Sequence, residues 1–250
     1  MLKLLFGSIG VLAVFAVATA TAPSVGAGAG NNHTVTLRIE RPASCTADVS
    51  LQVFDGQSNP PSVFTTTSGN QNVSVTARDN DFSIEADAEA TNCSVDHLRA
   101  YLRVDGVTLS KVVDNSSALD DPDLSMSGAV VAGVGPVSVS DIGTQAEPTG
   151  DFDVRMRTTA NPACDHVAAL VIQREDELFQ HVLLAPTTHS VRLPINDGDD
   201  VTGAAQATPD CPLNARIDGT LRQVGGPVLA SGFTTLINGT FVASGTFNAP

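Results

Sequence analysis

The chain has 250 residues, of which 42% are hydrophobic and only 4% aromatic, and it carries a formal net charge of −14 at pH 7. This length suits one large β domain or two of roughly 100 residues each, and the abundance of Val, Thr, Ser, Gly and Pro favours strands and turns over helices. Because no basic face for neutralising phosphates is visible in the sequence, we expect no nucleic-acid partner.

Residues 1–20 have the pattern of a secretory signal peptide. Lys3 provides the basic start, an apolar run follows from Leu4 to Val17, and the small residues after it allow cleavage, possibly as late as residue 29. The apolar run is at the short limit for a spanning helix, and an uncleaved anchor is the alternative. We predict a secreted or cell-surface protein without a membrane span in the mature chain.

The following residues alternate between apolar and polar positions, as strands with one buried face do. The first such strand contains Val35, Leu37 and Ile39, and similar runs lie around Leu51, Val75, Ile84 and Leu102. Residues 114–126 are polar and rich in turn formers, which predicts a long loop or a linker. The stretch from Gly128 to Val139 alternates again and is a candidate closing strand.

The segment from Val154 to Cys211 repeats the pattern of the segment from Val35 to Cys93. The cysteines of the two segments are 48 and 47 positions apart, and an acidic turn recurs shortly after the fourth strand of each. We therefore predict an internal duplication. A β-sandwich is expected in residues 31–141, a linker in 142–150, and a second sandwich in 151–250, with a weaker match after Cys211.

The four cysteines are predicted to form one disulfide in each repeat, Cys45–Cys93 and Cys164–Cys211. Each bond would close a loop of nearly 50 residues and stabilise the fold by roughly 4 kcal/mol. Short strands at regular intervals, tied by a long-range disulfide, favour an all-β fold of two tandem β-sandwich domains of immunoglobulin-like architecture. The core tryptophan typical of immunoglobulin domains is missing.

Two kinds of site are candidates. The turn formed by Asn196, Asp197, Gly198, Asp199 and Asp200 clusters oxygen ligands around a glycine, which suits Ca²⁺, although a plain hairpin turn uses the same residues. Among the Asn-x-Ser/Thr sequences, Asn72 and Asn115 are the best candidates for glycosylation. The histidines show no metal-ligand spacing and are expected on the surface: His33, His97, His166, His181 and His189.

No catalytic motif is visible, so we predict a non-catalytic protein that acts in binding, adhesion or extracellular structure. Its partner would be a protein, a glycan or further copies of itself. Self-association would use the strand near Val35 or the C-terminal Gly/Thr/Phe strands as free edges. The alternatives are an exported enzyme inhibitor, with Asn59-Pro60-Pro61 or Ala185-Pro186 as its loop, and a secreted hydrolase with a site between the two domains.

Overall fold

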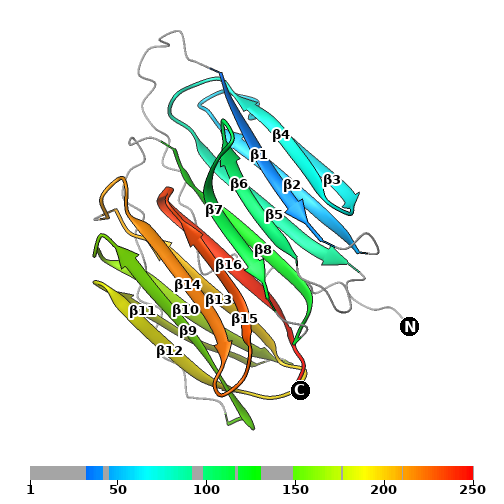
Figure 1. Cartoon of the computed structure of the whole chain (residues 1–250), viewed down its shortest axis with the longest axis vertical. Coiled ribbons are helices and arrows are strands. Elements are labelled where there is room, and N and C mark those ends of the chain that lie inside the picture. Colours follow the sequence, from blue (N-terminus) through cyan, green and yellow to red (C-terminus); the bar gives the residue numbers. More distant parts are fainter. Residues whose placement is uncertain are drawn as a thin grey trace.

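The computed structural model describes residues 32–41, 45–91, 98–115, 118–130, 149–175, 177–209 and 211–249. In these ranges the chain forms sixteen strands and no helix, and the strands build two antiparallel sheets of eight (Figure 1). No helix in them has the length and apolar character to cross a membrane. The predicted signal peptide, Cys93, His97 and most of the predicted linker lie outside the described residues.

The first sheet, sheet A, has eight strands in the order β12-β9-β14-β15-β7-β6-β1-β4. Their bounds, in the same order, are Thr188–Ile195, Phe152–Asn161, Arg216–Gln223, Val228–Thr234, Val107–Asp114, Arg99–Val104, His33–Glu40 and Gln71–Ala77.

The second sheet, sheet B, has the order β11-β10-β13-β16-β8-β5-β2-β3. Its strands span, in that order, Glu177–Ala185, His166–Arg174, Asp200–Ala207, Ile237–Phe247, Leu119–Ala129, Ser83–Thr91, Thr46–Phe54 and Ser62–Ser68.

The core lies between the two sheets and is built from the apolar positions of the alternating strands. In β1, Val35, Leu37 and Ile39 are fully buried while the residues between them are partly exposed, and β2 contributes Leu51 and Val53 from the opposite sheet. Burial of such a side chain stabilises the fold by about 1.5–3 kcal/mol. The alternation read from the sequence is therefore what places one face of each sheet in the core.

The strand order is the same in both halves of the molecule. From one end the order of sheet A is β4-β1-β6-β7, and from the other end it is β12-β9-β14-β15, which is the same order with eight added to each strand number. The strand order of sheet B has the same correspondence. The halves meet where β7 pairs with β15 and β8 pairs with β16, both antiparallel (Figure 1). Both sheets therefore run through the whole molecule.

One predicted loop is instead a central strand. Residues 114–126 were expected to form a loop or linker, but Leu119–Ala129 is β8, which pairs with β5 and β16. The turn-forming Asp-Asp-Pro sequence forms a bulge, in which Asp121 has a φ of 43° and the pairing with β16 shifts between Ser244 and Thr246. The expectation was wrong because bulges and turns use the same residue types.

The predicted free edges are also wrong. The strand near Val35 is β1, which lies between β4 and β6, and the C-terminal strands β15 and β16 each have neighbours on both sides. The outermost strands are β4 and β12 in sheet A and β3 and β11 in sheet B. Local alternation shows which face of a strand is buried, but it does not show which strands are its neighbours.

The disulfide prediction is confirmed for the second half, where Cys164 and Cys211 are bonded with an S–S distance of 2.02 Å. Cys45 also takes part in a disulfide. Its predicted partner, Cys93, lies outside the described residues.

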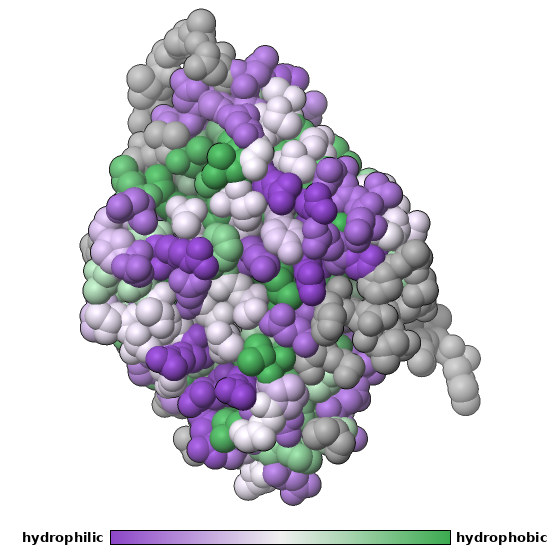
Figure 2. All heavy atoms as spheres, in the orientation of Figure 1, coloured by the Kyte–Doolittle hydropathy of each residue, from purple (hydrophilic) through white to green (hydrophobic). Residues whose placement is uncertain are grey.

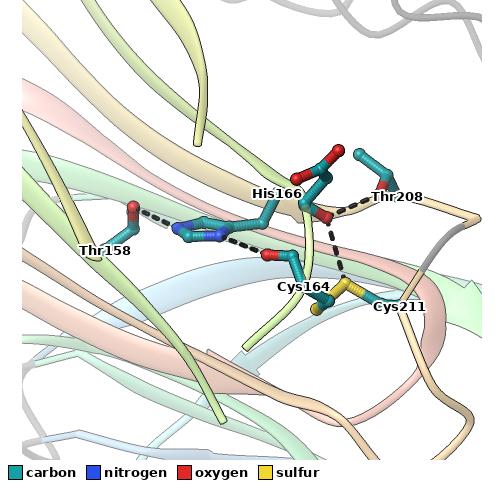
Figure 3. Close-up of a disulfide and its surroundings, with 6 residues drawn as sticks. Thr158, Cys164, His166, Thr208 and Cys211 are labelled. Carbon is teal, nitrogen blue, oxygen red and sulfur yellow. Dashed lines mark hydrogen bonds between the residues drawn. A yellow bond between two sulfur atoms is a disulfide. The ribbon is translucent and has the colours of Figure 1, made fainter. Parts of the chain in front are cut away.

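His166, beside this disulfide, is fully buried, so the expectation of a surface histidine is wrong for it. Figure 3 shows its ring between Thr158 and the backbone of Cys164. Nδ1 is 3.2 Å from the Cys164 carbonyl oxygen, which can only accept, so Nδ1 carries the proton and Nε2 accepts from the Thr158 hydroxyl at 2.8 Å. Burial lowers the pKa of His166 and favours this neutral form.

Candidate functional site: the arginine face

The charges of this acidic protein are separated between its two sheets. The strands of sheet A carry nine of the 13 Lys and Arg residues of the chain, and their apolar neighbours on each strand point into the core, so these side chains lie on the outer surface. We call this surface the arginine face; its basic residues are Arg38, Arg99, Arg103, Lys111, Arg155, Arg157, Arg192, Arg216 and Arg222.

Sheet B has the opposite charge. Its strands contain one basic residue, Arg174, and nine acidic ones: Asp48, Glu85, Asp87, Glu89, Asp120, Asp121, Asp123, Glu177 and Asp200. Arg174 is paired with Asp199 at 2.6 Å. The molecule therefore has one basic and one acidic face, and the premise that it lacks a basic face is wrong.

The acidic side chains on the arginine face are too few to neutralise it. Three of them point outward from sheet A, and each pairs with an arginine on the same face. Arg38 pairs with Glu40 at 2.7 Å, Arg216 with Asp218 at 2.7 Å, and Arg192 with Asp153. Six basic side chains on the face are left without a carboxylate among the described residues: Arg99, Arg103, Lys111, Arg155, Arg157 and Arg222.

Three arginines form a row across adjacent strands. Arg155 on β9 lies directly opposite Arg222 on β14 and, on its other side, opposite Arg192 on β12. Opposite side chains in a sheet are only ~5 Å apart at Cβ, and like charges placed so are destabilising. Arg157 follows two positions along β9, and only Arg192 of these four has a carboxylate partner in the described structure. An anion bound across the row would remove this repulsion.

Hydroxyl and aromatic side chains lie between the basic residues. Arg157 faces Thr220 on one side and Ser190 on the other, and Thr36 bonds Ser74 at 2.8 Å. In the other half of the face, the Tyr101 hydroxyl donates to Glu40 at 3.2 Å, and Lys111 and Arg103 lie over its ring at 5.3 and 5.8 Å. Burial and the Glu40 carboxylate raise the pKa of Tyr101, so the phenol stays a neutral donor.

The half of the face that contains the arginine row, around β14 and β15, has a second aromatic contact. The Arg216 guanidinium lies 3.9 Å from the centre of the Phe233 ring and also pairs with Asp218, which holds its planar group against the sheet. The face thus offers planar guanidinium groups, hydroxyls and two rings. Guanidinium groups bind carboxylate and sulfate in a bidentate manner, and hydroxyls bind neutral polar groups. Figure 2 shows a side of the molecule on which hydrophilic residues predominate and apolar ones form small separate groups.

The side-chain oxygens of the predicted calcium turn already accept hydrogen bonds, most of them from other segments of the chain. Asn196 accepts from the Asp151 amide at 3.0 Å, Asp197 from the Ala249 amide at 2.7 Å, and Asp200 from the Thr246 hydroxyl at 2.6 Å. Asp199 accepts from Arg174 and from the Asn196 amide. Within the described ranges no three His, Cys, Asp or Glu side chains are grouped so as to hold a metal ion.

The two predicted glycosylation sites differ in their surroundings. Asn72 is exposed on the outer surface of the edge strand β4. Asn115 is exposed just after β7, but its side-chain amide already donates to the Ser231 hydroxyl at 2.7 Å.

The place between the two halves, where a hydrolase site was considered, is filled by paired strands. A void of about 10 Å³, enough for about one water molecule, lies in the core of the second half beside this junction. Its lining is almost entirely apolar and includes Met156, Leu221 and Phe241.

The sequence does contain a signal for the arginine face. Arg155 and Arg157, and Arg99 and Arg103, occupy alternate positions of strands whose other positions are apolar, so each pair must lie on one outer surface. What the pattern lacks is the information that all these strands belong to one sheet.

Comparisons with protein-family models, with curated proteins and with solved structures find no match to this chain.

Proposed function

We propose that this chain is a secreted or cell-surface, non-catalytic protein that binds an acidic glycan through its arginine face. The observation that carries the proposal is the row of Arg222, Arg155 and Arg192, in which like charges stand directly opposite one another across three strands. Such a row is costly in the free protein and favourable around a polyanion, so its presence is accounted for by a negatively charged ligand.

A glycan suits the face better than a nucleic acid. The arginines are interleaved with hydroxyl side chains such as Ser190 and Thr220, which match the hydroxyl groups of a sugar. The arginines supply the bidentate contacts for its carboxylate or sulfate groups. The signal peptide predicted in residues 1–20 supports a location outside the cell, where acidic glycans are abundant and nucleic acids are not.

We infer further that the two halves arose by internal duplication. The supporting observations are the strand order, which is the same in both halves when eight is added to each strand number, and the near-equal spacing of the cysteines. A duplication also supports a polymer as ligand, because two linked copies of a weak binding surface act together on a repeating chain. An immunoglobulin-like relationship of each half remains part of this proposal.

Binding to defined polymers tests the proposal. The mature protein should bind polygalacturonate, which is carboxylated, and heparin, which is sulfated, but not neutral dextran. The affinity should fall steeply as the salt concentration rises, because binding releases counterions from the polyanion. We expect Arg155→Gln and Arg222→Gln each to weaken binding about five- to tenfold. Isothermal titration calorimetry at two salt concentrations measures both effects.

Arg78→Gln is the matched control, because Arg78 is exposed but lies outside the strands of the arginine face. It should leave the affinity unchanged. Equal loss in all three variants would indicate general charge attraction, and tighter binding of single-stranded DNA than of either polysaccharide would contradict the glycan assignment. Absence of binding to any polyanion would overturn the proposal.

A further inference from the structure

The end of the molecule formed by β3 and β4 has no protection against pairing with another strand. Both are outermost strands, β3 in sheet B and β4 in sheet A. Their sequences, SVFTTTS and QNVSVTA, contain no charged residue and no proline. Edge strands normally carry such residues because they prevent association with further strands.

The opposite end of the molecule has this protection in sheet A, where the outermost strand β12 contains Arg192 and Pro194. In sheet B the outermost strand there, β11, has one charged residue, Glu177, at its first position. The two ends have equivalent places in the strand order, so the difference between them is not a consequence of the fold. The end formed by β3 and β4 is the one whose two edge strands both lack a charged residue and a proline.

The outward backbone groups of β3 can be identified from its pairing with β2. The Val53 amide donates to the Pro61 carbonyl at 2.9 Å, so Val53 and Pro61 form a hydrogen-bonded pair. Hydrogen-bonded and non-hydrogen-bonded pairs alternate along an antiparallel ladder. The backbone amide and carbonyl groups of Val63 and Thr65 therefore point toward β2, and those of Phe64 and Thr66 point toward the open edge. These groups are available to another strand.

The side chains of β3 favour the same contact. Phe64 lies on the outer surface of the strand, opposite Ser50, and is 65% exposed. The strand is otherwise mostly Thr and Val, which have high strand propensity. An exposed, uncharged edge strand with a large apolar side chain is a surface that gains from being covered.

A second copy of the same chain is the partner that fits. Antiparallel pairing of β3 with β3 of another copy, centred on Thr65, places Phe64 of each copy opposite Thr66 of the other, so that outward groups meet outward groups. The molecule already contains a contact of this kind, since its two halves join by antiparallel pairing of the corresponding strands β8 and β16. We propose that two copies pair end to end through β3 into a two-fold symmetric dimer.

This inference is independent of the proposed ligand. In the dimer, sheet B would continue from one copy into the next. Its failure would leave glycan binding by a single copy intact.

The oligomeric state of the purified mature protein tests the dimer. Light scattering after gel filtration and sedimentation velocity over a wide concentration range should give twice the mass of one chain, with dissociation on dilution. Phe64→Lys places like charges close together across the contact, and Thr66→Pro removes an outward amide without removing a ladder bond to β2. Each should raise the dissociation constant about tenfold or more.

Leu184→Lys is the control, because Leu184 is 60% exposed on β11, the edge strand of the same sheet at the opposite end. It should leave the dimer intact. Circular dichroism should show the same strand content and thermal transition for all variants. A wild-type protein that is monomeric at every concentration overturns the proposal, as does a dimer that resists both β3 variants or dissociates only with Leu184→Lys.

Discussion

Asp123 on β8 shows how the acidic face affects a single side chain. It lies directly opposite Glu89 on β5, with Asp87 one pair further along the same surface, and Ser244 of β16 on its other side. Burial first, and then the charges of Asp87 and Glu89, raise the pKa of Asp123 to about 7. The Asp123 carboxyl group therefore keeps its proton at pH values at which an ordinary aspartate is ionised.

The raised pKa determines how stability depends on pH. From about pH 4 to 7 the folded protein keeps a proton on Asp123 that the unfolded chain has lost, so the contribution of this group to stability is complete below pH 4 and is lost as the pH rises to 7. Asp123→Asn should therefore be more stable than the wild type at pH 8, by about 1–2 kcal/mol because solvent screens this half-buried site. The two proteins should converge at pH 4.

Denaturant unfolding of both proteins from pH 4 to pH 8 measures this difference. His166 affects stability in the opposite sense, because its pKa is lowered in the folded protein. Its contribution to stability is therefore present above about pH 6.5 and is lost as the pH falls. It is the same in both proteins and cancels in the comparison. A difference between them that does not grow with pH would contradict the assignment to Asp123.

At the scale of strands, two glycines allow the sheets to meet around Phe241 of β16. A Cβ atom on Gly219 of β14 would lie 2.6 Å from the Phe241 ring, and one on Gly232 of β15 would lie 2.7 Å from it. Phe241 is 2% exposed and fills the core beside the junction of the two halves. These glycines are required by close packing rather than by a turn.

Gly219→Ala should therefore destabilise the protein by about 1–3 kcal/mol, because the added methyl group overlaps the Phe241 ring and must displace it. Differential scanning calorimetry measures the lowered melting temperature. Thr220→Ala on the same strand is the control, since its side chain lies on the outer surface and its loss should have little effect. Equal melting temperatures for Gly219→Ala and the wild type would show that the core yields without cost.

At the scale of the whole molecule, the two halves share both sheets. Strands β7 and β8 of the first half pair with β15 and β16 of the second, so in either half alone two strands would lose a neighbour. Backbone hydrogen bonds and core contacts then link the stability of one half to that of the other. The protein should behave as one folding unit.

We accordingly expect a single cooperative thermal transition whose calorimetric and van't Hoff enthalpies agree. A chain containing residues 149–250 alone should expose the edges of β15 and β16 and associate or unfold. Calorimetry of the full protein and light scattering of the half chain measure these outcomes. Two separate transitions, or a monomeric half with unchanged melting temperature, would show that the halves fold independently.

Much of the fold could be predicted from the sequence because burial is a local pattern in strands. Val35, Leu37 and Ile39, and Val154 and Met156 in the second half, are core residues as their alternation indicates. The Cys164–Cys211 bond was predicted from spacing and is present. The central strand β8 was missed because Asp120, Asp121 and Pro122 are turn formers that here form a bulge.

The sequence by itself determined which side of each strand faces the core, because the two-residue period of a strand is written in consecutive residues. The same rule applies to Arg155 and Arg157, whose alternate positions on β9 put them on an outer surface, although we expected no basic face from the sequence. Only the tertiary structure decided that β9, β12 and β14 are neighbours, that Arg222, Arg155 and Arg192 form a row, and that β3 rather than β1 is an edge. Strand neighbours are chosen by hydrogen bonding and packing between residues far apart in the chain, and no local pattern records that choice.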